Sequence, residues 1–317
     1  MTEKTTTPSD GEIERAAALL RSGKLVAFPT ETVYGLGANA LDSAAVDRIF
    51  EAKGRPPTSP LIVHVSSIDM ARLIVSEWPP DAELLARRFW PGPLTLVLKK
   101  HARISTRVTA GLDTVGVRVP AHPVALALLR EAGVPVAAPS ANRFGSVSPT
   151  RAEHVSASLG DGVDMILDGG PTEVGIESTV LSLAGDDPVL LRPGMISREQ
   201  IEEVIGPVSM ADTPSRDGGH ASPGLHVRHY SPSTPLMLIR PGESLPRGRG
   251  AYVFIATPRP AVRAVPMPNR PESYAAALYR TLHELDAEHF DWIAVELPPD
   301  GPAWFAIHDR LRRAAAG

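Results

Sequence analysis

Short apolar runs alternate with amphipathic stretches along the first two thirds of the chain. Runs of apolar residues bounded by Gly, Pro or polar clusters predict buried strands, at 25–28, 61–65, 94–98, 115–120, 134–142, 165–170 and 178–183. Apolar positions at helical spacing predict helices at 11–22, 43–53, 81–89 and 122–132. Strands interleaved with helices indicate an α/β sheet. The close spacing of 61–65, 94–98 and 115–120 favours a mixed sheet.

The pattern lapses between residues 207 and 233, which are rich in Pro, Gly, Ser and His. Apolar periodicity then resumes, with predicted strands at 235–240, 251–256 and 291–297 and predicted helices at 271–286 and 302–315. We therefore predict a larger α/β domain over 11–206, a linker over 207–233 and a small α/β domain over 234–317. An aperiodic segment of this length inside a compact protein is typically functional or disordered.

Composition narrows the class of protein. With 43% hydrophobic and 21% charged residues the chain is expected to be globular, and the absence of an apolar run of 18 residues predicts no membrane span. The first residues lack the pattern of a secretory signal, so a cytoplasmic protein is expected. The lack of cysteine excludes disulfides, thiolate metal ligands and a cysteine nucleophile. The acidic excess of the larger domain disfavours nucleic-acid binding, because such binding depends on phosphate neutralisation.

Candidate chemistry lies where predicted strands end. Residues 28–40 (FPTETVYGLGANA) carry the hydroxyls of Thr30, Thr32 and Tyr34 in what is predicted to be a glycine-rich turn after a strand. Ligands of open α/β sheets bind at such loops. An ordinary strand and turn is the alternative interpretation.

No Walker A or dinucleotide fingerprint is present, so a nucleotide would have to be bound in another way. The best candidate for a phosphate site is Lys53-Gly54-Arg55. A lysine beside a guanidinium suits a phosphate chain, although two cations also complement a helix C-terminus. Similar polar segments beside predicted strands follow at 139–142, 175–179 and 191–194. A fifth candidate lies in the linker and consists of Ser222-Pro223-Gly224 and His229-Tyr230. His64 is either a core histidine or a ligand-binding one. A metal site formed by linker histidines is not expected, because their spacing is not that of a zinc site.

Eight motifs occur in a fixed order: TETVYGLG, KGRP, PLIVH, FWPGPLTLVL, GVRVP, APSAN, GIESTV and LRPG. Together they resemble the threonylcarbamoyl-AMP synthase family with its YrdC-like catalytic domain. The segment SPGLHVRHYSP and the α/β tail resemble the longer, two-domain form of that family. The resemblance implies a twisted mixed-sheet YrdC-like domain with an open cavity, followed by a small Rossmann-like α/β domain.

The resemblance also implies the reaction and its site. L-Threonine, bicarbonate and ATP would be joined into threonylcarbamoyl-AMP with release of pyrophosphate, and a downstream complex would transfer the threonylcarbamoyl group to tRNA. Magnesium would accompany ATP, and no tightly bound organic cofactor is implied. Threonine would contact Thr32, His64, Arg118, Ser178 and the backbone of Ala138. ATP would contact Lys53, Arg55, Ser59, Thr114, Ser140, Asn142, Ser148, Arg192 and Tyr230. Lys53 and Arg55 would stabilise charge in the reaction.

The linker is expected to act as a lid over the cavity, and a plain tether between two domains is the alternative. Two other classes of function remain open: an RNA-binding or ribosome-associated module, and a relative of carbamoyltransferases that acts on carbamoyl phosphate. The acidic balance disfavours the first and makes direct tRNA binding unexpected. The lack of Cys-rich zinc motifs and of acylphosphatase-like segments disfavours the second.

Overall fold

The computed structural model describes residues 7–211 and 229–316. The larger part of the chain forms a mixed sheet of ten strands in the order β10-β9-β8-β4-β5-β3-β6-β2-β1-β7. Its strands are β1 (Val26–Phe28), β2 (Gly35–Asn39), β3 (Ile62–His64), β4 (Leu94–Lys99), β5 (Thr114–Arg118), β6 (Val136–Ala137), β7 (Met165–Ile166), β8 (Thr179–Ser182), β9 (Val189–Arg192) and β10 (Ser209–Met210). The predicted mixed α/β class is confirmed.

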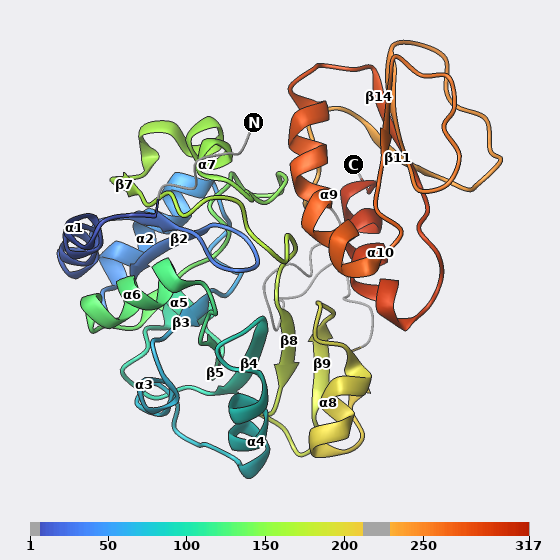
Figure 1. Cartoon of the computed structure of the whole chain (residues 1–317). Helices are drawn as coiled ribbons and strands as arrows, with labels where there is room; N and C mark the ends of the chain where they lie inside the picture. The colour runs from blue at the N-terminus through green and yellow to red at the C-terminus, as the bar shows by residue number, and fades with distance from the viewer. Residues whose placement is uncertain (1–6, 212–228, 317) are drawn as a thin grey trace.

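Helices cover both faces of this sheet (Figure 1). Helices α1 and α6 pack on one face, and most of the others pack on the opposite face, where the larger core lies. Their bounds are α1 (Asp10–Arg21), α2 (Ser43–Lys53), α3 (Ile68–Arg72), α4 (Pro80–Phe89), α5 (Thr106–Thr109), α6 (Pro123–Ala132), α7 (Ala152–Leu159) and α8 (Arg198–Ile205), with a 3₁₀ turn η1 (Gly160–Gly162).

The remaining residues form a second sheet of four parallel strands, in the order β11-β14-β12-β13. Its elements are β11 (Leu236–Ile239), β12 (Gly250–Phe254), β13 (Arg263–Pro266), α9 (Pro271–Asp286), β14 (Trp292–Glu296), η2 (Pro302–Trp304) and α10 (Phe305–Ala314). Helices α9 and α10 lie on the side of this sheet that faces the larger domain (Figure 1). Their apolar residues share one core with Val33, Val147 and Ile176 of that domain.

Two local predictions were wrong. Residues 35–39 form strand β2 rather than a turn, because they pair with both β1 and β6. Gly37 is required there: a Cβ on it would lie 2.8 Å from the Phe28 ring and 2.9 Å from Val136. In addition, β10 lies within the segment interpreted as linker, and it pairs with β9.

Helix α2 begins and ends where the pattern predicted, and its N-cap is Asp42. The Asp42 carboxylate accepts hydrogen bonds from the backbone N–H groups of Ala44 and Ala45. Gly54 ends the helix in the left-handed conformation, with φ of 60°. This cap fixes the chain direction between Lys53 and Arg55. In the part of the chain that the structure describes, no helix is long and apolar enough to cross a membrane.

Candidate active site

A small cavity, with a free volume of about 50 Å³, lies between the large sheet and the C-terminal part of the chain. Its lining comes from the loops after β1, α2 and β6, from β2, β3 and β5, from the residues just before β8, from the end of β9, and from residues 229 and 230. Nine predicted site residues line it: Thr32, Arg55, His64, Arg118, Ala138, Ser140, Ser178, Arg192 and Tyr230.

Strand alternation explains why His64 and Arg118 face the same cavity. Strands β3 and β5 are parallel neighbours, with Ile62 opposite Gly116 and His64 opposite Arg118. Successive side chains of a strand point to opposite faces, so Val63 points into the larger core while its two neighbours in β3 face the cavity. The two polar side chains are thereby held side by side on rigid strands.

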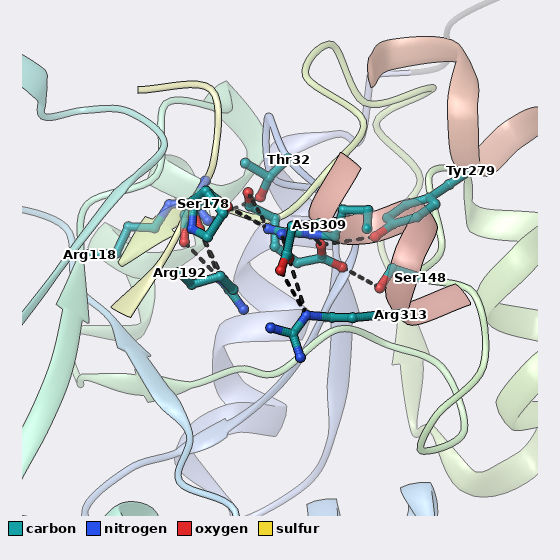
Figure 2. A network of polar contacts seen from close by, with 11 residues as sticks. Thr32, Arg118, Ser148, Ser178, Arg192, Tyr279, Asp309 and Arg313 are labelled. Carbon is teal, nitrogen blue, oxygen red and sulfur yellow. Dashed lines mark hydrogen bonds and ion pairs between the residues drawn. The ribbon is translucent and has the colours of Figure 1, made fainter. Parts of the chain in front are cut away.

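Arg118 is buried and its guanidinium is held on three sides. Its Nε donates to the carbonyl of Gly92 at 3.2 Å, and its Nη1 donates to Thr32 Oγ1 at 3.0 Å (Figure 2). Its Nη2 lies 2.7 Å from a carboxylate oxygen of Glu31, which is also buried. Thr32 is fixed in turn by Thr30, whose hydroxyl lies 2.8 Å away. This guanidinium is therefore preorganised to receive a carboxylate.

His64 is neutral in this environment. Burial, with a smaller effect from the nearby charge of Arg118, lowers the pKa of its imidazole to about 3. Its Nδ1 is buried and has no hydrogen-bond partner among the described residues. A buried polar atom without a partner costs free energy, so this nitrogen is available for a polar group of a ligand.

Ser178 and Arg192 form the next part of the cavity wall. Arg192 donates from Nε and Nη2 to the Ser178 carbonyl, at 3.1 and 3.0 Å (Figure 2). The Ser178 hydroxyl lies 2.8 Å from the hydroxyl of Thr95. Gly194 permits this arrangement, because a Cβ on it would lie 2.3 Å from the Thr179 nitrogen. The guanidinium thus enters the cavity from a fixed strand end.

Lys53 and Arg55 lie together at the end of α2, and both are buried. Lys53 Nζ donates to the carbonyls of Ser140, at 2.6 Å, and Asn142, at 2.5 Å, so it lies directly behind the cavity wall. Burial holds the pKa of Lys53 well below its ordinary value, and Arg55 adds to this effect. Burial also lowers the pKa of Arg55 to about 10, against the opposing effect of Tyr230. An anion close to these two side chains would stabilise their charged forms and raise both pKa values.

Five predicted residues do not line the cavity: Lys53, Ser59, Thr114, Asn142 and Ser148. Ser59 accepts a hydrogen bond from Arg55 Nη2 at 2.5 Å and so positions that guanidinium. The Asn142 amide donates to the carbonyls of Arg143 and Ser146, and it stabilises the turn there. Ser148 donates to Glu177 at 2.6 Å. Thr114 begins β5, four residues before Arg118, so it lies about 13 Å further along the strand.

Tyr230 is buried and adopts a left-handed backbone conformation, with φ of 62°. Its ring stacks on Tyr279 of α9 at 5.8 Å between centroids, and the guanidinium of Arg310 of α10 lies 5.3 Å from its centre. Tyr230 therefore reaches the cavity while packed against the C-terminal domain. Residues 212–228, which include most of the predicted lid, lie outside the described residues.

Three charged residues of the site were not assigned from the sequence. Glu31 pairs with Arg118, Glu177 lines the cavity, and Arg310 approaches Glu177 from the C-terminal domain. The two glutamates lie inside motifs whose hydroxyls were singled out, so a search for counter-ions to the motif arginines would have pointed to them. Arg310 sits in an ordinary helical pattern and gives no such signal.

The cavity is strongly cationic in the part of the chain that the structure describes, because its wall there carries Arg55, Arg118 and Arg192 but one carboxylate, Glu177. Such a site suits an anionic ligand with a carboxylate and phosphates. Its free volume is well below the 300–1,000 Å³ or so of typical ligand pockets.

The chain belongs to the threonylcarbamoyl-AMP synthase family. Residues 18–194 match the family model described as telomere recombination, of the Sua5, YciO and YrdC proteins. Residues 196–316 match the C-terminal domain of threonylcarbamoyl-AMP synthase. The resemblance noted in the sequence is thus confirmed for both parts of the chain.

Similar proteins match over nearly the whole length. The threonylcarbamoyl-AMP synthase of Bacillus subtilis is 46% identical, over 98% of this chain and 94% of its own. That of Pyrococcus abyssi is 43% identical, over 96% and 94%. The crystal structure of P. abyssi Sua5 complexed with L-threonine superposes with a TM-score of 0.91 and 41% identity, over 98% of this chain and 96% of that one. This likeness confirms the two-domain fold.

Proposed function

We propose that this protein joins L-threonine, bicarbonate and ATP into threonylcarbamoyl-AMP and releases pyrophosphate. One observation carries the proposal: a single buried cavity combines a fixed guanidinium suited to a carboxylate with further cations suited to phosphates. The full-length similarity to threonylcarbamoyl-AMP synthases supports it. The product would serve tRNA modification through a downstream transfer complex in the cytoplasm.

In this reaction Arg118 would bind the threonine carboxylate, since a bidentate guanidinium fixes both position and direction. Thr32, Ser178 and the neutral His64 would receive the hydroxyl and amine, and the Ala138 backbone would close the pocket. The amine would attack the bicarbonate carbon to give a carbamate, and one oxygen of bicarbonate would leave as water. With its nitrogen held in place, the carbamate oxygen would be directed at the α-phosphorus of ATP.

The nucleotide would lie toward Arg55 and Arg192, with Lys53 behind them and Tyr230 at the side. A carbamate and a triphosphate repel each other, so fixed cations are needed where charge builds on the phosphoryl oxygens. Ser140, which lines the cavity, would also contact ATP. Ser59, Asn142 and Ser148 would act through the residues they hold, and a direct contact of Thr114 with ATP remains a prediction.

Magnesium would arrive with ATP and offset charge on its phosphates. Glu177 in the cavity wall is already paired with Arg310, and Glu31 is paired with the wall residue Arg118. Among the residues that the structure describes, no group of three His, Asp or Glu side chains is arranged to hold a metal ion. These observations fit a cation held mainly by the phosphates.

The direct test is an assay of pyrophosphate release, with mass detection of the adenylate. We expect release to require threonine and bicarbonate together, because the carbamate is the nucleophile. The assay also separates the alternatives, since an RNA-binding module would show no such release and a carbamoyltransferase relative would require carbamoyl phosphate. Release that is independent of bicarbonate would contradict the proposal.

Serine is expected to be a poorer substrate than threonine. Val33, Ile62 and Ala138 supply the apolar lining near Thr32, where the methyl group of threonine would pack. One methyl is worth only about 1–3 kcal/mol, so kcat/KM should fall roughly 10- to 200-fold. Steady-state rates with threonine, serine and glycine measure this difference. Equal rates with all three would contradict the assigned pocket.

A further inference from the structure

Glu177 lies in the wall of the catalytic cavity, yet the C-terminal domain supplies its counter-charge. Arg310 Nε of α10 lies 2.7 Å from Glu177 Oε2, and both side chains are almost fully buried. Tyr279 of α9 donates to the same oxygen at 3.0 Å, while Ser148 donates to Oε1 at 2.6 Å (Figure 2). The carboxylate is therefore held from both domains.

Arg310 makes further contacts with the catalytic domain. Its Nη2 donates to the Pro193 carbonyl at 2.9 Å, beside the Arg192 strand end, and its guanidinium faces the Tyr230 ring. On its own helix, Asp309 lies 2.5 Å from Nη1 and also binds Arg313 at 3.0 Å. These contacts fix the guanidinium of Arg310 in one geometry, against Glu177 and Tyr230 of the cavity wall.

The charge of Glu177 matters for an anionic nucleotide. Burial raises the pKa of this carboxyl, but Arg310, Arg192 and the Ser148 hydrogen bond together bring it below its ordinary value. Glu177 is therefore ionised at neutral pH. Without its partner in α10, a buried carboxylate would face the site of the phosphates and repel them.

We propose that Arg310 is a positioning residue that neutralises and orients Glu177, so that the C-terminal domain completes the nucleotide half of the cavity. Tyr279 supports the same carboxylate. This inference rests on the proposed function, because it assigns ATP to that half. It predicts that loss of the pair weakens nucleotide binding while the threonine half, around Arg118 and His64, stays intact.

The first test is Arg310→Gln in the full chain. We expect the KM for ATP to rise at least 10-fold, whereas threonine affinity by calorimetry changes less than about 2-fold. Glu177→Gln placed in the same chain removes the uncompensated charge, so the double variant should recover most of the lost ATP affinity. A double variant as impaired as Arg310→Gln would overturn the proposal.

The pH profile separates neutralisation from a merely structural role. The charged and titratable groups facing Glu177 are Arg310, Arg192, Tyr230 and Tyr279. In Arg310→Gln burial is no longer offset by Arg310, so the Glu177 pKa rises and the group becomes neutral as pH falls. The ATP defect of this variant should therefore shrink toward low pH. A defect independent of pH, in a variant that melts like the wild type, would contradict the inference.

Matched variants guard against loss of folding. Arg263→Gln removes an exposed ion pair of the C-terminal domain, with Glu288 at 3.0 Å, and should leave the KM for ATP unchanged. Tyr279→Phe removes only a hydroxyl and should raise the KM for ATP several-fold. An unchanged KM in Tyr279→Phe would overturn the role given to Tyr279, and would overturn the whole proposal if Arg310→Gln did not fold.

Direct nucleotide binding keeps the two proposals separate. Titration with a non-hydrolysable ATP analogue measures affinity without turnover. If the wild type made no adenylate while these affinities followed the expected order, the proposed reaction would fail and the role of Arg310 would stand. If adenylate formed normally and Arg310→Gln bound the analogue as the wild type does, only the role of Arg310 would fail.

Discussion

Replacing Arg118 with alanine is expected to weaken threonine binding roughly 30- to 4,000-fold, which corresponds to about 2–5 kcal/mol for removing one partner of a buried charge pair. Contacts with Gly92, Thr32 and Glu31 hold the Arg118 guanidinium in a fixed position before any ligand binds. Turnover at saturating threonine should fall much less, because Arg118 acts away from the reacting phosphorus. Calorimetric titration with threonine measures the loss.

The ion pair with Glu31 requires a control for this experiment. Arg118→Ala alone leaves a buried carboxylate unpaired, which also destabilises the fold. Adding Glu31→Gln removes that charge, so the double variant reports on threonine binding with less effect on stability. If a folded double variant bound threonine as the wild type does, Arg118 would be excluded from the threonine site.

Lys53→Ala is expected to lower kcat by roughly 100- to 1,000-fold while threonine affinity remains within a few-fold. Loss of one donor that stabilises developing charge typically costs about 2.7–4 kcal/mol of barrier. Arg55→Ala should behave similarly, because the two groups lie at the same helix end and both gain from an added anion. Single-turnover measurements of adenylate formation separate this effect from ATP binding.

The control for Lys53 is Lys99→Ala, which removes an exposed lysine paired with Glu77. Lys53→Met keeps the aliphatic stem and tests whether the loss is one of packing. Its Nζ also holds the Ser140 and Asn142 carbonyls, so both variants require a thermal melt beside the kinetics. Wild-type turnover in folded Lys53→Met would remove Lys53 from the reaction.

Sequence patterns predicted an element best where the residues that set its ends lie within the element itself. Helices α2 and α9 span the residues that periodicity indicated, because their apolar faces and caps are local features. Strand β2 was misjudged, since its glycines look like a turn until the strands on either side are known. The same distinction applies to the site. Motif residues such as His64 and Arg118 meet in one cavity, whereas their acidic partners depend on contacts across the fold.

Arg310 shows where a single sequence gives no guidance. It pairs with Glu177, 133 residues earlier in the chain, and nothing in the helix around it marks it as different from other surface-helix arginines. Only the packing of α10 against the large domain brings that position into contact with Glu177, which lines the cavity, and with Pro193. Contacts of this kind depend on how the two domains pack against each other, and the spacing of residues within a motif does not predict that packing.

The same pair has a consequence for protein synthesis. A ribosome adds roughly 5–20 residues per second, and N-terminal domains fold first. Glu177 therefore emerges several seconds or more before Arg310, which lies on the last helix that the structure describes. During that interval the catalytic domain has every motif arginine but carries a carboxylate without its partner. Nascent chains should thus bind nucleotide more weakly until α10 has docked on the catalytic domain.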